Sequence, residues 1–433
     1  MTTVPERGRA RRWRRRASTL ALAAACGIAA RAGSDGGTPL PIGPRAYGDR
    51  PTVETMAGLG ARIFMDASLS ASGRQSCASC HDPAHAFAPP NALPVQLGGV
   101  DLRHPGVRNA PSLMYLQTTI PFTEHYIDDE DGHGDDAGPT GGLTWDGRVD
   151  SPHEQALIPL FAPHEMANRD ARALAARVRK AAYADEFRAA FSAPGRNVLD
   201  DPEQTVRWLA MALEIYQQTP AVFYPFTSKF DAVLRHQASY TPQEARGLAL
   251  FDDPNRGNCA TCHPSAIRSD GGFPLFTDAG HVDIGVPRNP AIAANRDPRY
   301  HDLGLCGPLR TDLAHDDELC GAFKAPSLRN VALRGSYFHN GAMHSLKDVL
   351  EFYVDRDLHP ERWYARRADG AVQRYDDLPE RLRGHVNREV PFEPLPGDQP
   401  RLTAAEIDDV IAFLHTLTDG YGPVPAVQPT TSR

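Results

Sequence analysis

The chain has 433 residues, of which 41% are hydrophobic and 23% charged, with 36 Gly, 38 Pro and a formal net charge of −8. One hydrophobic core seldom supports so long a chain, so we expect two domains, and the frequent Pro and Gly predict long irregular connections between helices. An acidic chain repels phosphate backbones, which argues against nucleic acid as a partner.

The first 32 residues have the organisation of an export signal. Five arginines between Arg11 and Arg16 precede a short apolar run, and Ala30-Arg31-Ala32 is a candidate cleavage site. The run is too short to span a bilayer permanently; a disordered basic tail is the alternative. Removing residues 1–32 takes away eight Arg and one Glu, which changes the formal charge from −8 to −15. We therefore expect an exported protein, in contact with a membrane only if it is lipidated at Cys26.

Residues 33–52 are predicted to form a linker rich in Gly and Pro, and a helical pattern follows over 53–65. An irregular stretch then extends to about residue 148 and contains the acidic segment 128–136. The spacing of these carboxylates matches no standard calcium loop, so we interpret the segment as a solvated loop.

Helical periodicity marks five further segments. They are residues 171–191, 203–218, 241–251, 345–353 and 403–417. Two of them begin with a capping box, formed by Thr241 with Glu244 and by Thr403 with Glu406. No series of alternating polar and apolar residues indicates a large sheet, so the chain is predicted to be mainly α.

Two Cys-x-x-Cys-His motifs account for four of the seven cysteines. The motifs are Cys77, Cys80 and His81, and Cys259, Cys262 and His263. The pattern is typical of c-type haem attachment, in which two thiols bond the vinyl groups and the histidine ligates iron. Random placement predicts roughly 0.004 such motifs in this chain, so coincidence is a poor explanation. We predict two covalently bound haem c groups.

A zinc site and a redox-active dithiol are the two alternatives to haem attachment, and the sequence favours neither. A zinc site requires no histidine directly after each pair, and a thioredoxin-like dithiol requires a βαβ context that is missing here. Cys306 and Cys320 lie outside both motifs. In an oxidising compartment we expect these two to form a disulfide.

The order of elements repeats along the chain as a helix, a haem motif, loops and a closing helix. We therefore predict two cytochrome c-like helical domains with one c-type haem each, joined by long irregular connections. The N-terminal haem domain covers residues 53–240, the C-terminal haem domain covers 241–420, and 421–433 form a tail.

These features resemble the bacterial di-haem cytochrome c peroxidase family, including its MauG-type branch. The resemblance covers roughly residues 50–420 and rests on six short motifs around the two haem motifs. They are Asn109-Ala-Pro-Ser-Leu, Trp145-Asp-Gly-Arg148, Glu154-Gln155-Ala, His164-Glu165-Met166, Phe323-Lys-Ala-Pro-Ser-Leu-Arg-Asn330 and Tyr337-Phe-His-Asn-Gly341. The resemblance implies a periplasmic peroxidase whose N-terminal haem, held by His81, has an open distal face.

The resemblance places Gln155, Pro159 and Glu165 on that distal face. A carboxylate there can move a proton between the two peroxide oxygens, so Glu165 is the candidate acid–base, and Gln155 is expected to orient peroxide. A surface position beside Pro163 is the alternative for Glu165. Trp145 corresponds to the tryptophan that bridges the two haems, where an indole relays electrons; an ordinary buried tryptophan is the alternative.

The C-terminal haem, held by His263, is expected to be six-coordinate. The family's usual methionine ligand is replaced by Tyr353, which is the substitution of the MauG-type branch. A phenolate is a hard anionic ligand, as in catalase, and favours higher iron oxidation states. In the alternative, Tyr353 packs at the haem edge and Met343 is the ligand.

The family also carries a calcium ion between its domains. The matching groups are the side chain of Asn109 and the main-chain carbonyls of Arg334 and Ser336, where Arg and Ser replace the usual Thr and Pro. Any residue supplies a main-chain carbonyl, so these positions are still compatible with a calcium ion. Classical members also place a removable histidine ligand after the first haem motif. Residues 91–100 contain no histidine and neither His85 nor His104 is a close match, so we expect an enzyme that needs no reductive activation.

The leading hypothesis is a cytochrome-c peroxidase-type oxidoreductase that reduces hydrogen peroxide to water with electrons from a small cytochrome c or cupredoxin. Tyr353 and Trp145 suggest a second, a MauG-like enzyme that uses peroxide to oxidise a residue of a protein substrate. A plain electron-transfer cytochrome has two six-coordinate haems and no reaction with peroxide, and Glu165 and Gln155 argue against it.

Overall fold

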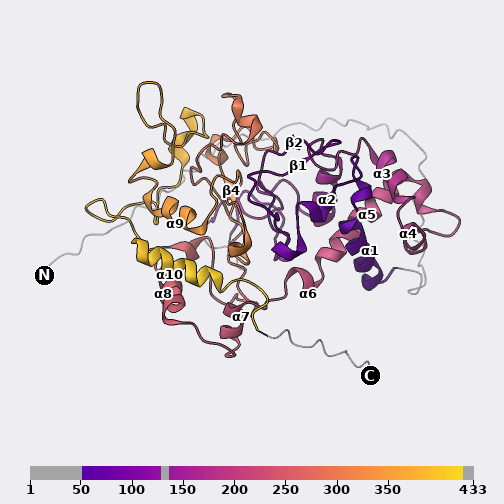
Figure 1. Ribbon diagram of the computed structural model, residues 1–433, viewed down its shortest axis with the longest axis horizontal. Helices are drawn as coiled ribbons and strands as arrows, with labels where there is room; N and C mark the ends of the chain where they lie inside the picture. Colours follow the sequence, from indigo (N-terminus) through magenta and orange to yellow (C-terminus); the bar gives the residue numbers. More distant parts are fainter. Residues whose placement is uncertain (1–50, 128–135, 423–433) are drawn as a thin grey trace, which may run out of the picture. The chain divides into compact units, whose positions relative to one another are not determined.

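The computed structural model describes residues 51–127 and 136–422 of the chain. Its α-helices are α1 (Val53–Met65), α2 (Pro152–Phe161), α3 (Ala171–Val178), α4 (Ala184–Phe191), α5 (Pro202–Gln217), α6 (Pro220–Phe223), α7 (Lys229–Leu234), α8 (Pro242–Asp252), α9 (Leu346–Asp355) and α10 (Ala404–His415). Its β-strands are very short and form two antiparallel pairs. The strand β1 (Leu97–Gly98) pairs with β2 (His104–Pro105), and β3 (His281–Val282) pairs with β4 (Phe323–Lys324). The described part is therefore mainly α, as predicted (Figure 1).

Some predicted features fall outside this part of the chain. They are the export signal with Cys26, most of the 33–52 linker, the acidic residues 128–135 and nearly all of the tail. Across 51–127 and 136–422, no helix combines the length and the apolar character needed to cross a bilayer.

The helices predicted near 53–65, 203–218, 241–251, 345–353 and 403–417 are confirmed as α1, α5, α8, α9 and α10. Both capping boxes form: the Thr241 and Thr403 hydroxyls accept from backbone amides three residues later, and the Glu244 and Glu406 carboxylates accept from the capping residues. Such local bonds satisfy helix-end amides that have no intrahelical partner.

One helix prediction was wrong, and the helices α2, α6 and α7 were not predicted. Residues 171–191 form two helices, α3 and α4, because the chain turns at 179–183, which leaves Val178, Tyr183 and Phe187 all buried in one core. The helix α2 was missed because Pro159 lies inside it. Since Pro159 is in the last turn, it removes only one helical hydrogen bond, and Ser151 with Pro152 still starts the helix.

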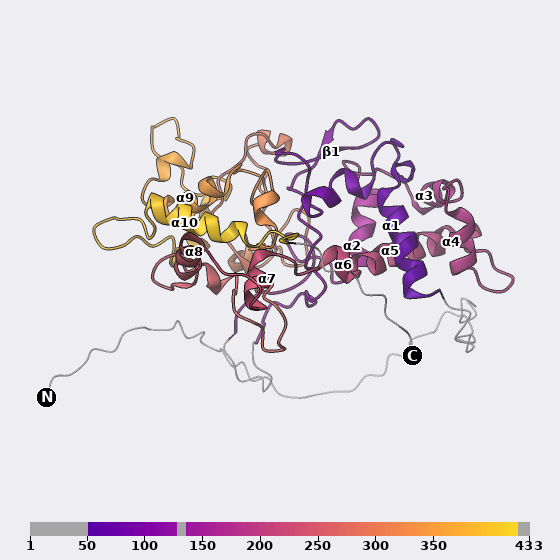
Figure 2. The same ribbon diagram turned by 60° about the horizontal axis from the view of Figure 1, so that its bottom comes forward.

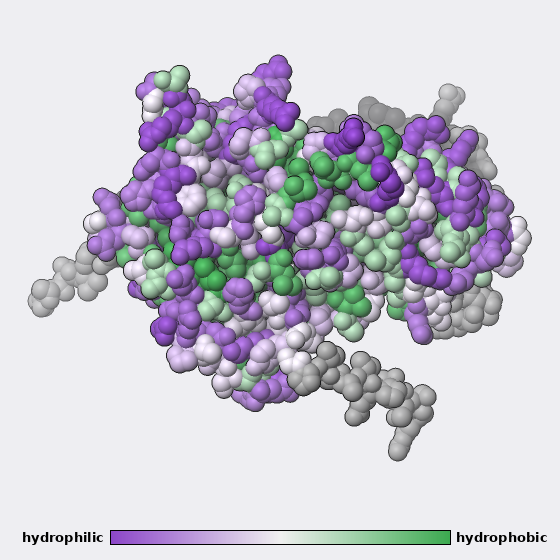
Figure 3. All heavy atoms as spheres, in the orientation of Figure 1, coloured by the Kyte–Doolittle hydropathy of each residue, from purple (hydrophilic) through white to green (hydrophobic). Residues whose placement is uncertain are grey.

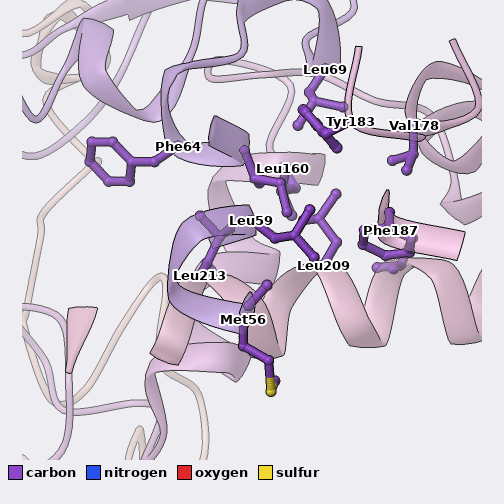
Figure 4. Close-up of a cluster of buried hydrophobic side chains, with 14 of the residues drawn as sticks. Met56, Leu59, Phe64, Leu69, Leu160, Val178, Tyr183, Phe187, Leu209 and Leu213 are labelled. Atoms are coloured by element: carbon purple, nitrogen blue, oxygen red, sulfur yellow. The ribbon is translucent and has the colours of Figure 1, made fainter. Parts of the chain in front are cut away.

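Two large hydrophobic clusters organise the described residues. In the first, α1, α2 and α3 pack on α5, around buried residues such as Leu59, Leu160 and Leu209 (Figure 4). In the second, α8 and α9 pack on α10, around Phe251 and Phe413. Figures 1 and 2 show α1 to α5 grouped together and α7 to α10 grouped together. On the face drawn in Figure 3, hydrophobic residues are interspersed with hydrophilic ones, consistent with most large apolar side chains lying inside.

The same close helix crossing occurs in both clusters. A Cβ added at Gly60 of α1 would lie 2.1 Å from the carbonyl oxygen of Ala212 on α5. A Cβ added at Gly247 of α8 would lie 2.0 Å from the carbonyl oxygen of Asp409 on α10. In each case the helix that precedes a haem motif touches the backbone of a later helix, so only glycine fits at the crossing.

Candidate haem sites

The first haem motif folds into a 3-10 turn, Cys77–Ser79, which places the backbone of its histidine next to that of its first cysteine. The His81 amide donates to the Cys77 carbonyl at 2.9 Å, and the ring Nδ1 of His81 lies 3.2 Å from the carbonyl oxygen of Phe87. A carbonyl only accepts, so Nδ1 donates and Nε2 retains a lone pair for iron. Burial raises the pKa of Cys77 to about 12 and lowers that of His81 to about 4, which keeps both groups neutral.

The second haem motif repeats this geometry. The turn Cys259–Thr261 carries His263, whose amide donates to the Cys259 carbonyl at 2.9 Å and whose Nδ1 donates to the Phe276 carbonyl at 2.8 Å. All four motif thiols are unpaired, whereas Cys306 and Cys320 form a disulfide. Each motif therefore presents two thiols and one oriented imidazole, the set that attaches haem c.

Each motif opens into its own cavity, of about 450 Å³ at the first motif and about 670 Å³ at the second. The first is lined by Gln75 and Gln117, whose buried side-chain oxygens have no hydrogen-bond partner among the described residues. The second is lined by Asp283 and His339, which have one such atom each. Buried polar atoms without partners cost free energy, so they fit cavities that hold a bound group with polar edges.

The predicted distal residues meet at the first cavity. Gln155 and Pro159 are four residues apart on one face of α2, and Glu165 follows the end of that helix. All three line the cavity that also contains His81. Because Pro159 has no N–H, the main-chain carbonyl of Gln155 lacks its usual helical donor.

Glu165 lies in an environment that favours its protonated form. Its side chain is 38% exposed and lines the first cavity, yet burial by the surrounding protein raises its pKa to about 7, with Arg148 acting in the opposite direction. The imidazole Nε2 of His164 lies 3.7 Å from a Glu165 carboxylate oxygen and lines the same cavity. A carboxyl group with a pKa near neutral pH can both accept and donate a proton.

His164 was not singled out from the sequence, although it stands in the His164-Glu165-Met166 motif. The histidines that were weighed as ligands lie elsewhere: His85 contacts Asp82 at 2.8 Å and His104 contacts Asp101 at 3.5 Å. Neither is among the residues that line the first cavity. Direct reaction without reductive activation stays a prediction.

Trp145 lines both cavities, together with Pro111, Leu116 and Thr144. Its indole Nε1 donates to the main-chain carbonyl of Asn109 at 2.7 Å, and the ring is 9% exposed. The aromatic ring thus lies in the wall between the two sites. Packing alone explains a buried tryptophan, but not its contact with both cavities.

Tyr353 lines the second cavity with His263, and its ring stacks on Phe392 at a centroid distance of 5.2 Å. Its hydroxyl forms no hydrogen bond with another described residue. Burial raises the pKa of this phenol, so the phenolate requires a positive centre beside it. Met343 is buried in the hydrophobic cluster and is not among the residues that line the cavity.

The methylamine utilization protein MauG of Paracoccus denitrificans is 36% identical to this chain over 388 residues, covering 88% of this chain and 92% of MauG. The chain belongs to the di-haem cytochrome c peroxidase and MauG family. Residues 54–239 match the family model described as "Di-haem cytochrome c peroxidase". The cytochrome c551 peroxidase of Pseudomonas aeruginosa is 28% identical over 332 residues, which cover 74% of this chain and 78% of that protein.

Two solved structures of the diheme peroxidase BthA from Burkholderia thailandensis share the fold. One is 41% identical with a TM-score of 0.73, and the other, a variant in which tyrosine is replaced by methionine, is 40% identical with a TM-score of 0.75. Each alignment covers 86% of this chain and 87% of BthA. The protein is therefore a di-haem peroxidase-type oxidoreductase with two cytochrome c-like domains and two covalently bound haem c groups.

The sequence did not predict the buried ion pairs of this di-haem peroxidase. Arg108 donates to Asp146 and to Asp302 at 2.7 Å each, and all three side chains are at most 7% exposed. Arg108 lines the first cavity, whereas Asp302 and Lys324 line the second. Asp146 adjoins Trp145 in a recognisable motif. Asp302, however, is 194 residues from Arg108, so no local sequence pattern predicts the ion pair between Arg108 and Asp302.

The residues expected to bind the family's calcium ion lie together but do not fit a metal. The guanidinium of Arg334 donates to the side-chain oxygen of Asn109 and to the main-chain oxygen of Ser336, two of the three expected ligands. The calcium expectation is therefore not supported.

Proposed function

We propose that the protein is a periplasmic peroxidase that reduces hydrogen peroxide at the His81 site, using electrons that a small cytochrome c or cupredoxin delivers through the His263 site. The first cavity supports this most directly. It combines a carboxyl group of raised pKa, Glu165, and an amide, Gln155, with the proximal histidine.

When bound, the haem groups supply one-electron redox chemistry and, at His81, a position for peroxide. In the proposed reaction, the Glu165 carboxylate accepts the proton of one peroxide oxygen and delivers it to the other peroxide oxygen as the O–O bond breaks. The Gln155 amide orients peroxide by hydrogen bonding. Two electrons from the donor and two protons from solvent convert one hydrogen peroxide into two water molecules, and Glu165 ends in its initial state.

Trp145 is proposed to relay electrons between the sites, which its contact with both cavities supports. The mature chain that we expect has a formal charge of −15, which would attract a basic donor protein. Tyr353 is proposed as the second axial ligand at the His263 site. Its place in that cavity favours it over Met343.

A MauG-like activity is the second candidate, and Tyr353 together with Trp145 favours it. In that reaction the partner's residue loses two electrons and two protons, and peroxide is again reduced to two water molecules. The electrons leave a protein residue instead of a reduced redox protein, so the two candidates differ in their electron source.

The test uses the mature holoenzyme with peroxide and reduced small cytochrome c or cupredoxin, in turnover assays. Rapid donor oxidation at a 2:1 ratio to peroxide supports the peroxidase. Slow donor oxidation, with a peroxide-dependent mass change in a co-purified partner protein, supports the MauG-like activity. No spectral change on adding peroxide would leave only a plain electron-transfer cytochrome.

Export and domain organisation are proposed on the sequence alone. We propose cleavage after the 1–32 signal, with lipidation only if processing occurs at Cys26, and haem domains at 53–240 and 241–420. Fractionation of cells that express the full chain and Cys26→Ser tests this: both should reach the periplasm, and membrane retention of the unsubstituted chain alone would establish the lipid anchor.

A further inference from the structure

A half-buried guanidinium, that of Arg334, lies among oxygen atoms from two distant parts of the chain. Nη2 of Arg334 donates to Asn109 Oδ1 at 2.7 Å and to the Ala110 carbonyl at 3.0 Å, and its Nε donates to the Ser336 carbonyl at 3.3 Å. None of these acceptors is a carboxylate, and Arg334 forms no ion pair with a described residue. Neutral oxygens arranged around one point are a setting for a cation.

Neighbouring side chains and backbone hold these oxygens in place. Asn109 donates through Nδ2 to the Ser336 hydroxyl at 2.6 Å, and that hydroxyl donates to the Leu93 carbonyl at 3.1 Å. A Cβ added at Gly335 would lie 2.9 Å from the Cα of Ala92. The segment around residue 335 is therefore pressed against residues 92–93, and the space for the guanidinium is well defined.

The guanidinium matches this setting in charge and in geometry. It is planar, carries one positive charge and has five N–H donors directed outward. An arginine side chain keeps its proton in proteins, so the group is a cation at neutral pH. A calcium ion would need six to eight oxygen ligands at 2.3–2.6 Å, and the Asn109 oxygen already accepts from Arg334.

We propose that the Arg334 guanidinium replaces the calcium ion expected between the haem domains, so that the holoenzyme is assembled and active without calcium. The cation is then part of the chain and cannot be removed by a chelator. Either proposed function is compatible with this replacement.

Arg334 also acts as a positioning residue for Trp145. It holds the side chain of Asn109, and the main-chain carbonyl of the same Asn109 accepts from the Trp145 indole at 2.7 Å. Asn109 thus connects the guanidinium to Trp145, in the wall between the two cavities. Loss of the cation should disturb the indole unless another cation takes its place.

The test compares the holoenzyme with Arg334→Thr, which restores the family's usual residue. Both are incubated with millimolar calcium, desalted and assayed for metal by mass spectrometry. We expect less than about 0.1 calcium per chain in the unsubstituted enzyme and about one in the variant. The variant's Tm should also rise by a few degrees with calcium and fall with EGTA, because a ligand of the folded state stabilises it. Arg299→Thr, at an arginine that is 88% exposed, is the matched control.

One tightly held calcium per chain in the unsubstituted enzyme, or loss of its haem spectrum in EGTA, would overturn the proposal. A folded Arg334→Thr that binds no calcium would also overturn it. Should that variant fail to fold, the metal content and EGTA response of the unsubstituted enzyme still decide, and Arg334→Lys, which keeps the charge, should fold without calcium. These readouts do not depend on peroxide turnover, so failure here is distinguishable from failure of the proposed function.

Discussion

The indole of Trp145 is fixed by one hydrogen bond, from its Nε1 to the main-chain oxygen of Asn109, at a position where its ring lines both haem cavities. A backbone carbonyl is a very weak base, so this partner orients the indole without readily taking its proton. The geometry suits a ring that passes charge between two centres.

Trp145→Phe tests that role. The substitution leaves a buried carbonyl without its donor, so we expect a loss of about 1–3 kcal/mol in stability. Peroxide should still react at the His81 site, but re-reduction of that site by electrons entering at the His263 site should slow. Stopped-flow spectroscopy separates the two phases. Unchanged re-reduction would show that Trp145 is only a packing residue.

Glu165→Gln keeps the size of the side chain and removes its ability to accept a proton. We expect peroxide cleavage to slow by about 10²- to 10⁴-fold, the range for loss of a general acid–base, with both haem groups still bound. Glu154→Gln, at an exposed position of α2, the helix that precedes Glu165, should react normally. Equal rates in the two variants would remove Glu165 from the mechanism.

The pH dependence of the reaction follows from the raised pKa of Glu165, which is about 7. The base is the carboxylate, which predominates above that pH and is protonated below it. The rate constant for peroxide should therefore be level above about pH 8 and fall about tenfold per unit below about pH 6. Glu165→Gln should abolish this slope. A slope that persists in the variant would point to His164, 3.7 Å away.

Tyr353→Phe removes the phenolic oxygen and keeps the ring that packs on Phe392. We expect the six-coordinate, low-spin spectrum of the C-terminal haem to give way to a high-spin one. Met343→Leu is the companion variant, and its spectrum should not change because Met343 does not line the cavity. The opposite pattern would identify methionine as the ligand.

Gly60→Ala should destabilise the N-terminal haem domain by about 1–3 kcal/mol, because its Cβ would meet the Ala212 carbonyl and force α1 away from α5. Gly58→Ala, in the same helix with open space around it, should instead stabilise by up to about 1 kcal/mol, as alanine does in exposed helices. Thermal unfolding of both holoproteins provides the comparison. Equal Tm values would mean that α1 moves freely.

Local sequence patterns predicted much of the structure. The haem motifs, the capping boxes at Thr241 and Thr403 and the apolar faces of α5 and α10 depend on residues a few positions apart, whose geometry the backbone sets. The family motifs brought Gln155, Pro159 and Glu165 to attention, and the structure places them at one cavity. The position of His164 beside them was not foreseen.

Only the tertiary structure decided what lies between the two haem sites. Arg334 forms a hydrogen bond with Asn109, 225 residues away, and Arg108 forms one with Asp302, 194 residues away. No spacing in the sequence predicts such pairs. They form because packing of distant segments removes water from charged groups, which must then find partners inside the protein. The sequence by itself therefore determined which cofactors are attached and where the helices begin, whereas chain packing decided that an arginine occupies the place expected for a metal.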